Sequence, residues 1–150
     1  MEKKSKFQPD KLHFLSFHLL KGVVEGAFDF DPSKSEVYQY DLDYSAEIAT
    51  ESAEVKSNFS VTVKTDSKGN NPLEAEACFS FAFLFKVENL NELISEVAPN
   101  QFEVDFPLAN AIASISYSTA RGILLTRLQG TALREFILPI IDPNILLKGK

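Results

Sequence analysis

The 150-residue sequence contains no tryptophan, one methionine and a single cysteine, Cys78. A lone thiol cannot form an internal disulfide, so the chain does not depend on an oxidising compartment. Basic residues are fewer than acidic ones, with 15 Lys and Arg against 21 Asp and Glu and a formal net charge of −6. This balance, without any basic cluster beside aromatic residues, argues against a nucleic-acid surface and against binding to an anionic membrane.

Long apolar runs are missing as well. No run reaches the roughly 20 residues of a membrane span. The short apolar run near the N-terminus contains His13, Ser16 and His18 and is not followed by a small-residue cleavage site, so it does not fit a secretory signal. We therefore expect a cytoplasmic protein without direct membrane insertion.

Signals for catalysis are also missing. The sequence has no phosphate-binding loop, no Gly-x-Ser-x-Gly motif and no glycine fingerprint for a dinucleotide. His13 and His18 fall on opposite faces of a strand, and Cys78 has no nearby histidine in the sequence. Asp41 and Asp43 share a strand face, which is typical of exposed acids on an outer face. We expect no enzyme activity, no cofactor, no metal site and no catalytic residue.

Aromatic residues are abundant instead. The chain has 13 Phe and 4 Tyr and is 45% hydrophobic, which is typical of a folded globular protein. Its length favours one domain over residues 1–150, with residues 1–11 expected to be disordered.

The stretch EAEACFSFAFLFKV, residues 74 to 87, places a phenylalanine at every second position. Side chains alternate between the two faces of a strand, so four rings share one face: Phe79, Phe81, Phe83 and Phe85. Each Phe buries roughly 150–250 Å², whereas the largest apolar patch on a monomer is about 300–600 Å². Something must cover this face.

Three further segments have the alternation of strands. They are residues 12–30, with Gly22 and Gly26 indicating a bend or bulge, residues 37–48, and residues 54–65. Short polar connections join the four predicted strands, which favours an antiparallel sheet with one apolar and one wet face.

The period changes after Val87. Residues 88–98 are expected to form a short helical or irregular connector, and a long helix is expected to follow, with Asp105 as N-cap and Pro107 in the first turn. Gly122 is a possible interruption of this helix and Gly130 its C-cap. The helix is rich in Ala and Ser, so we expect it to cover the sheet only in part, with the remaining apolar area left for other subunits or a ligand. The fold class is therefore α+β, a four-stranded antiparallel sheet followed by a short connector and one long helix.

This order of elements, the EAEACFSF strand and the segment DFPLANAIASISYSTARG together resemble the SecB family of export chaperones and its SecB-like relatives. The resemblance covers residues 12 to 147. The stretch between Phe106 and Phe136 is longer than in typical members, and the chain ends where they continue into a second helix and an acidic tail. The sequence is more similar to the divergent SecB-like branch of the family, some members of which act in toxin-antitoxin systems.

The resemblance implies an ATP-independent holdase that binds unfolded client proteins in hydrophobic grooves and keeps them competent for export or folding. It also implies a homotetramer built as a dimer of dimers. The client-binding candidates are the aromatic and apolar residues of the second and fourth predicted strands: Tyr38, Tyr40, Leu42, Tyr44, Phe79, Phe81, Phe83 and Phe85.

In this family an acidic outer sheet face receives the SecA translocase. The corresponding docking candidates are Glu25, Asp29, Asp31, Glu74 and Glu76. A toxin-antitoxin pair is the alternative partner. An alternative for these carboxylates is that they only keep the protein soluble. An alternative for the phenylalanines is that they form an ordinary hydrophobic core. A different class of function, a small-molecule carrier that wraps the aromatic face around a lipid-like ligand, remains open at this point.

Overall fold

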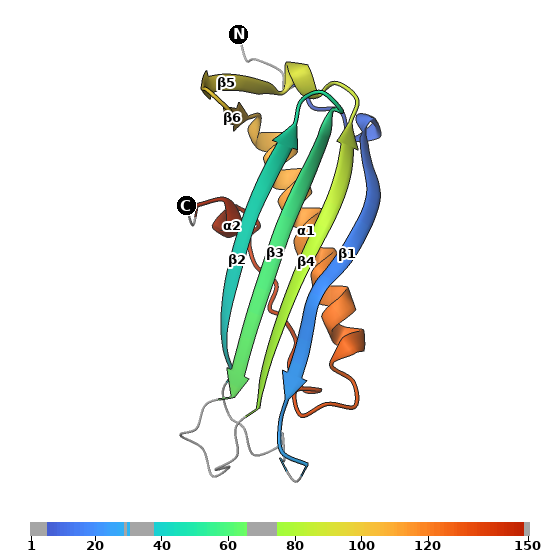
Figure 1. The fold of residues 1–150 in the computed structure, drawn as a ribbon, viewed down its shortest axis with the longest axis vertical. Helices are drawn as coiled ribbons and strands as arrows, with labels where there is room; N and C mark the ends of the chain where they lie inside the picture. Colours follow the sequence, from blue (N-terminus) through green and yellow to red (C-terminus); the bar gives the residue numbers. More distant parts are fainter. Residues whose placement is uncertain (1–5, 29, 31–37, 66–74, 149–150) are drawn as a thin grey trace.

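The computed structural model describes residues 6–28, 30, 38–65 and 75–148. Four long strands form one antiparallel sheet in the order β1-β4-β3-β2 (Figure 1). Together with one long helix, this sheet confirms the predicted α+β fold. The strands are β1 (Leu12–Glu25), β2 (Tyr38–Ala49), β3 (Glu54–Thr65) and β4 (Glu76–Val87).

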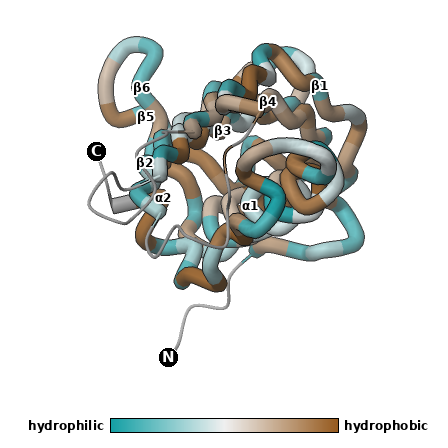
Figure 2. The backbone as a smooth tube through the Cα atoms, turned by 90° about the horizontal axis from the view of Figure 1, so that it is seen from below, coloured by the Kyte–Doolittle hydropathy of each residue, from teal (hydrophilic) through white to brown (hydrophobic). Residues whose placement is uncertain are grey.

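The long helix, α1 (Phe106–Arg127), lies against one face of the sheet, so the molecule has two layers (Figure 2). This is the face that carries the β4 phenylalanines, whose side chains are only 0–3% exposed. The predicted small residues let the helix approach closely, since Ala113, Ser116 and Ala120 are fully buried. The larger buried residues of α1 are Leu108, Ile112, Tyr117 and Leu124.

The chain beyond α1 completes the cover. Its residues run back along the same face and end in the short helix α2 (Asn144–Lys148). Five large apolar side chains from this part are buried: Leu128, Leu133, Phe136, Leu138 and Leu146. The expectation that the β4 rings leave an excess for other subunits or a ligand is therefore wrong, because α1 and the C-terminal segment cover them within one chain.

Strand β1 is bulged, as predicted, but not at its glycines. The register with β4 shifts between Phe14 and Ser16 and again between Leu19 and Lys21, so Leu15 and Leu20 are the extra residues. Gly22 is not part of a bulge. A Cβ at this position would lie 3.1 Å from the ring of Phe79. The glycine therefore allows close packing of β1 on the ring face.

The connector after β4 differs from the prediction. A single 3-10 turn, η3 (Leu90–Glu92), is followed by a β-hairpin of β5 (Ile94–Ala98) and β6 (Gln101–Val104). Its two-residue turn is Pro99 and Asn100, and Asn100 adopts a positive φ of 61°. Asparagine tolerates this left-handed conformation better than most residues, which permits the tight turn.

Helix α1 starts where the sequence predicts. Asp105 occupies the N-cap position and Pro107 lies in the first turn, although the Asp105 side chain makes no capping hydrogen bond. Gly122 lies inside the helix and does not interrupt it. The helix ends at Arg127 and its C-cap is Leu128, so the prediction that Gly130 is the C-cap is wrong.

The N-terminal segment packs on the sheet end from residue 6 onward. A 3-10 turn, η1 (Pro9–Lys11), precedes β1. The Asn89 side chain donates a hydrogen bond to the Lys6 carbonyl at 3.1 Å, and the Glu88 N–H donates to the Lys11 carbonyl at 3.0 Å. Residues 6–11 are thus placed by specific contacts, whereas residues 1–5 of the segment expected to be disordered, 1–11, lie outside the described residues.

Candidate functional site

An apolar cavity remains open beside β2, between the hairpin and α2. Its volume is about 130 Å³, comparable with the roughly 150 Å³ apolar cavity that accommodates benzene in another protein. It therefore has room for one ring or one branched aliphatic side chain. The lining residues come from β2, β3, β6, α1 and α2, and they are Tyr44, Ala46, Ile48, Val55, Phe102, Val104, Ala109, Ile112 and Leu147.

Small residues keep this cavity open. Ala46 of β2 and Ala109 of α1 stand among larger neighbours in its wall. The hairpin supplies Phe102 and Val104 from β6, both on the same side of that strand because side chains alternate with period two.

A buried polar cluster lies under the cavity. The hydroxyls of Ser57 on β3 and Ser116 on α1 are 2.7 Å apart, and both residues are fully buried. Tyr44 adjoins them. Burial raises the pKa of Tyr44 to about 12, although a hydrogen bond with Ser57 acts in the opposite direction. The phenol is therefore neutral at physiological pH, and the cavity wall carries no charge there.

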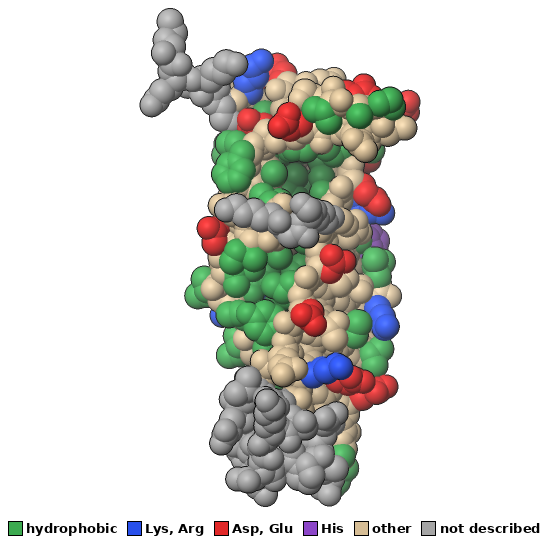
Figure 3. Space-filling model, turned by 90° about the vertical axis from the view of Figure 1, so that its left-hand side faces the viewer, with side chains coloured by type: hydrophobic (Ala, Val, Ile, Leu, Met, Phe, Trp, Pro, Cys, Tyr) green, Lys and Arg blue, Asp and Glu red, His purple; other side chains and the backbone are tan. Residues whose placement is uncertain are grey.

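The apolar surface continues along β2 below the cavity. Tyr40 is 39% exposed and Leu42 is half-buried. The rings of Tyr38 and Tyr40 contact Phe136, with centroids 5.3 and 6.1 Å apart. Figure 3 looks onto this side and shows apolar side chains gathered along much of its length, with acidic side chains beside them. We call the cavity residues together with Tyr40 and Leu42 the β2 apolar surface.

The structure divides the predicted client-binding residues into two groups. Tyr40, Leu42 and Tyr44 belong to the β2 apolar surface, and Tyr38 lies next to it against Phe136. The other group is the core ladder of β4, which is buried under α1: Phe79, Phe81, Phe83 and Phe85. The ring centroids of Phe79 and Phe81 are 6.2 Å apart, and those of Phe81 and Phe83 are 6.0 Å apart. These four rings do not reach the surface of the chain.

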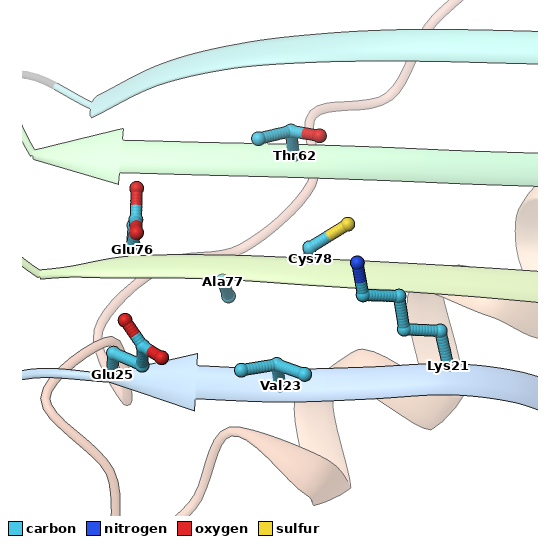
Figure 4. A pocket seen from close by; sticks show the side chains of 7 residues that line it. All are labelled: Lys21, Val23, Glu25, Thr62, Glu76, Ala77 and Cys78. Carbon is cyan, nitrogen blue, oxygen red and sulfur yellow. The ribbon is translucent and has the colours of Figure 1, made fainter.

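The acidic candidates lie elsewhere, on the outer face of the sheet. Glu25 and Glu76 face each other across β1 and β4. Lys21 lines the same hollow (Figure 4), and Lys64 pairs with Glu76 from β3. The charge there is mixed and not uniformly acidic. The remaining three candidates lie outside the described residues: Asp29, Asp31 and Glu74.

Sequence reasoning missed the hairpin residues Phe102 and Val104. A signal for them exists, because polar and apolar residues alternate in QFEV, directly after the turn residues Pro99 and Asn100, which is typical of a strand that follows a turn. No comparable signal points to Leu147, whose position depends on the path of the whole C-terminal segment.

Within the described parts of the chain, no group of three or more His, Cys, Asp or Glu side chains is placed to hold a metal ion. None of the described helices is sufficiently long and apolar to cross a membrane.

The fold, a four-stranded antiparallel sheet with one long helix on its apolar face, is similar to that of a solved SecB-like chaperone. The structure is similar to that of the SecB-like chaperone Rv1957 of Mycobacterium tuberculosis, with a TM-score of 0.56 over 88% of this chain and 91% of that chain. Rv1957 was solved in complex with a ChAD peptide from the HigA1 antitoxin Rv1956. The two sequences are 16% identical, so the likeness is one of fold. No family model and no curated protein matches the sequence.

The burial of Tyr44 predicts a loss of stability at high pH. Its pKa is about 12 in the folded chain, against 10.0 for an ordinary phenol, so between these values only the unfolded state ionises. The free energy of unfolding should therefore fall as pH rises from 10 towards 12. Urea unfolding at several pH values checks this. In Tyr44→Phe the fall should be smaller, and an identical pH dependence in both proteins would contradict the buried phenol.

Proposed function

We propose that this protein is an ATP-independent holdase that binds unfolded polypeptides at the β2 apolar surface and keeps them from aggregating. The observation that carries the proposal is the open cavity beside β2. It is lined by apolar side chains and admits one client side chain at a time. Tyr40, on the same face of the same strand, is exposed. The SecB-like fold supports the same reading.

The position of β2 suits an extended client. It is an edge strand of the sheet, so one row of its backbone N–H and C=O groups has no partner within the sheet. A client segment lying along this edge would present alternate side chains to the apolar surface, as peptides do when they add to a sheet edge. Apolar contacts need area and not a fixed pattern of hydrogen bonds, so many sequences would bind.

The competing carrier function has less support. Sites for drug-sized ligands usually measure about 300–1,000 Å³, whereas the cavity beside β2 measures about 130 Å³. The aromatic face that a carrier would wrap around its ligand is occupied by α1.

Among the two client systems, an antitoxin segment is the better first candidate. A structurally similar chaperone holds an antitoxin peptide, and we propose clients of that kind here. Docking of the SecA translocase has weaker support, because Lys21 and Lys64 accompany Glu25 and Glu76 on the outer face and reduce its negative charge. We place this activity in the cytoplasm, without ATP or another cofactor.

We also propose that the chain assembles through β1, the other edge of the sheet. Its exposed apolar residues are Phe14, Leu15, Phe17, Leu20 and Val23, which are 41–63% exposed. An exposed, apolar edge strand readily pairs with another chain. Pairing of β1 with its own copy would give a twofold dimer.

The helix beside β1 supports a further contact between such dimers. Its outward side carries Ser118, Gly122 and Thr126 at four-residue spacing, all exposed. Small side chains allow another helix to approach closely. A homotetramer built as a dimer of dimers would use both surfaces.

The holdase activity can be tested by light scattering of reduced lactalbumin, which aggregates when its disulfides are broken. Without ATP, near-stoichiometric protein should suppress the scattering. Ala46→Leu should fill the cavity and weaken binding of permanently unfolded, carboxymethylated lactalbumin by about tenfold, the effect of losing one anchored apolar side chain.

The matched control is Ala49→Leu, which adds the same side chain to the same strand on the opposite face. It should bind like the wild type. Equal suppression of the scattering by all three proteins would contradict client binding at the cavity. If the wild type does not suppress the scattering, the protein is not a holdase.

The assembly is tested by charge on the β1 edge. A double variant, Leu15→Lys with Leu20→Lys, should produce monomers in sedimentation velocity, because like charges would face each other across the pairing strands. Phe28→Lys is the control, since Phe28 is fully exposed beyond the end of β1. An unchanged mass for the double variant would contradict assembly through β1.

A further inference from the structure

Residues 136–141, FILPII, form an irregular segment between α1 and α2 that we call the C-terminal strap. Its side chains are alternately buried and exposed at first: Phe136 and Leu138 are 6% and 1% exposed, whereas Ile137 is 53% exposed. Ile140 is 88% exposed. The pattern is that of an extended chain lying on an apolar surface.

The strap is held from two sides. On the β2 side, the ring of Phe136 rests against Tyr38 and Tyr40. On the α1 side, Arg121 Nε donates a hydrogen bond to the carbonyl of Leu138 at 2.7 Å. The hydroxyl of Tyr117, one helical turn before Arg121, donates to the carbonyl of Pro139. Two side chains at a spacing of four residues thus bind two consecutive carbonyl groups.

Backbone pairing contributes little to this attachment. Between residues 137 and 141, no backbone hydrogen bond to another described backbone group is present. Pro139 has no N–H to donate. The segment is therefore held by apolar contacts of alternate side chains and by side-chain donors to its carbonyls.

These contacts do not depend on the identity of the strap. Any extended polypeptide offers backbone carbonyls at the same spacing, and any apolar side chain can replace Phe136 or Leu138. The strap also lies against Tyr40, which belongs to the β2 apolar surface. The place that it occupies is thus continuous with the proposed client site.

We propose that the C-terminal strap is an internal occupant of the client site, and that an extended segment of a client displaces it. This inference rests on the proposed holdase function. Displacement would extend the open cavity into a longer site containing Tyr38, Tyr117 and Arg121. The free chain would then be autoinhibited, since its apparent affinity for clients is reduced by the fraction of molecules in which the strap is displaced.

The first test weakens the strap without touching its apolar contacts. Arg121→Met keeps a long aliphatic side chain but removes the donor to the Leu138 carbonyl. Carboxymethylated lactalbumin should bind this variant about five- to tenfold more tightly, as expected for the loss of one partly exposed charged hydrogen bond that holds the strap. Arg127→Met, on the same helix and exposed, is the control and should bind like the wild type.

The second test measures whether the strap leaves its place. Leu138 is 1% exposed, so the thiol of a folded Leu138→Cys variant should react slowly with iodoacetamide in the free protein. Its alkylation should become faster when carboxymethylated lactalbumin, which has no free thiol, saturates the variant. Slower or unchanged alkylation with the client bound would overturn the displacement, as would unchanged or weaker binding by a folded Arg121→Met variant. Either result leaves the holdase function in place. If the wild type binds no lactalbumin, the proposed function fails and the inference fails with it.

Discussion

The aromatic face of the central sheet has to be covered, and the rest of the structure depends on how the chain does this. Burying one Phe contributes about 1.5–3 kcal/mol, and β4 alone places four rings on this face. Helix α1 approaches closely through its small residues but is too narrow to cover the whole sheet. The C-terminal segment completes the cover through Leu133, Phe136 and Leu138.

The two edges of the sheet are where this cover ends. On the β1 side, Phe14 and Phe17 lie at the margin of the ring cluster and stay partly exposed. On the β2 side, the cavity at Ala46 and the exposed Tyr40 remain open. We propose that one edge binds another copy of the chain and that the other binds a client. In our account, assembly and client binding both depend on the apolar area that α1 and the C-terminal segment leave uncovered.

Period-two patterns made the sheet predictable from the sequence. The four alternate phenylalanines of β4 lie on one buried face and Cys78 lies on the opposite face, because alternation is a local property of a strand. The hairpin was missed because its first strand, residues 94–98, lies within the segment 88–98 that was expected to be a helical or irregular connector. The role of Phe136 and Leu138 could not be predicted, since it depends on which tertiary surface α1 leaves free. For the same reason, the sequence indicated Tyr40 and Tyr44 for the site but could not separate them from the β4 rings.

The location of the client is tested most directly by photo-crosslinking from β2. Benzoylphenylalanine replaces Tyr40, which is on the apolar face, or Gln39, which is next to it on the outer face. After irradiation with carboxymethylated lactalbumin, the account predicts a covalent adduct from position 40 and little or none from position 39. Adducts of equal yield from both positions, or from position 39 alone, would contradict client binding at the β2 apolar surface.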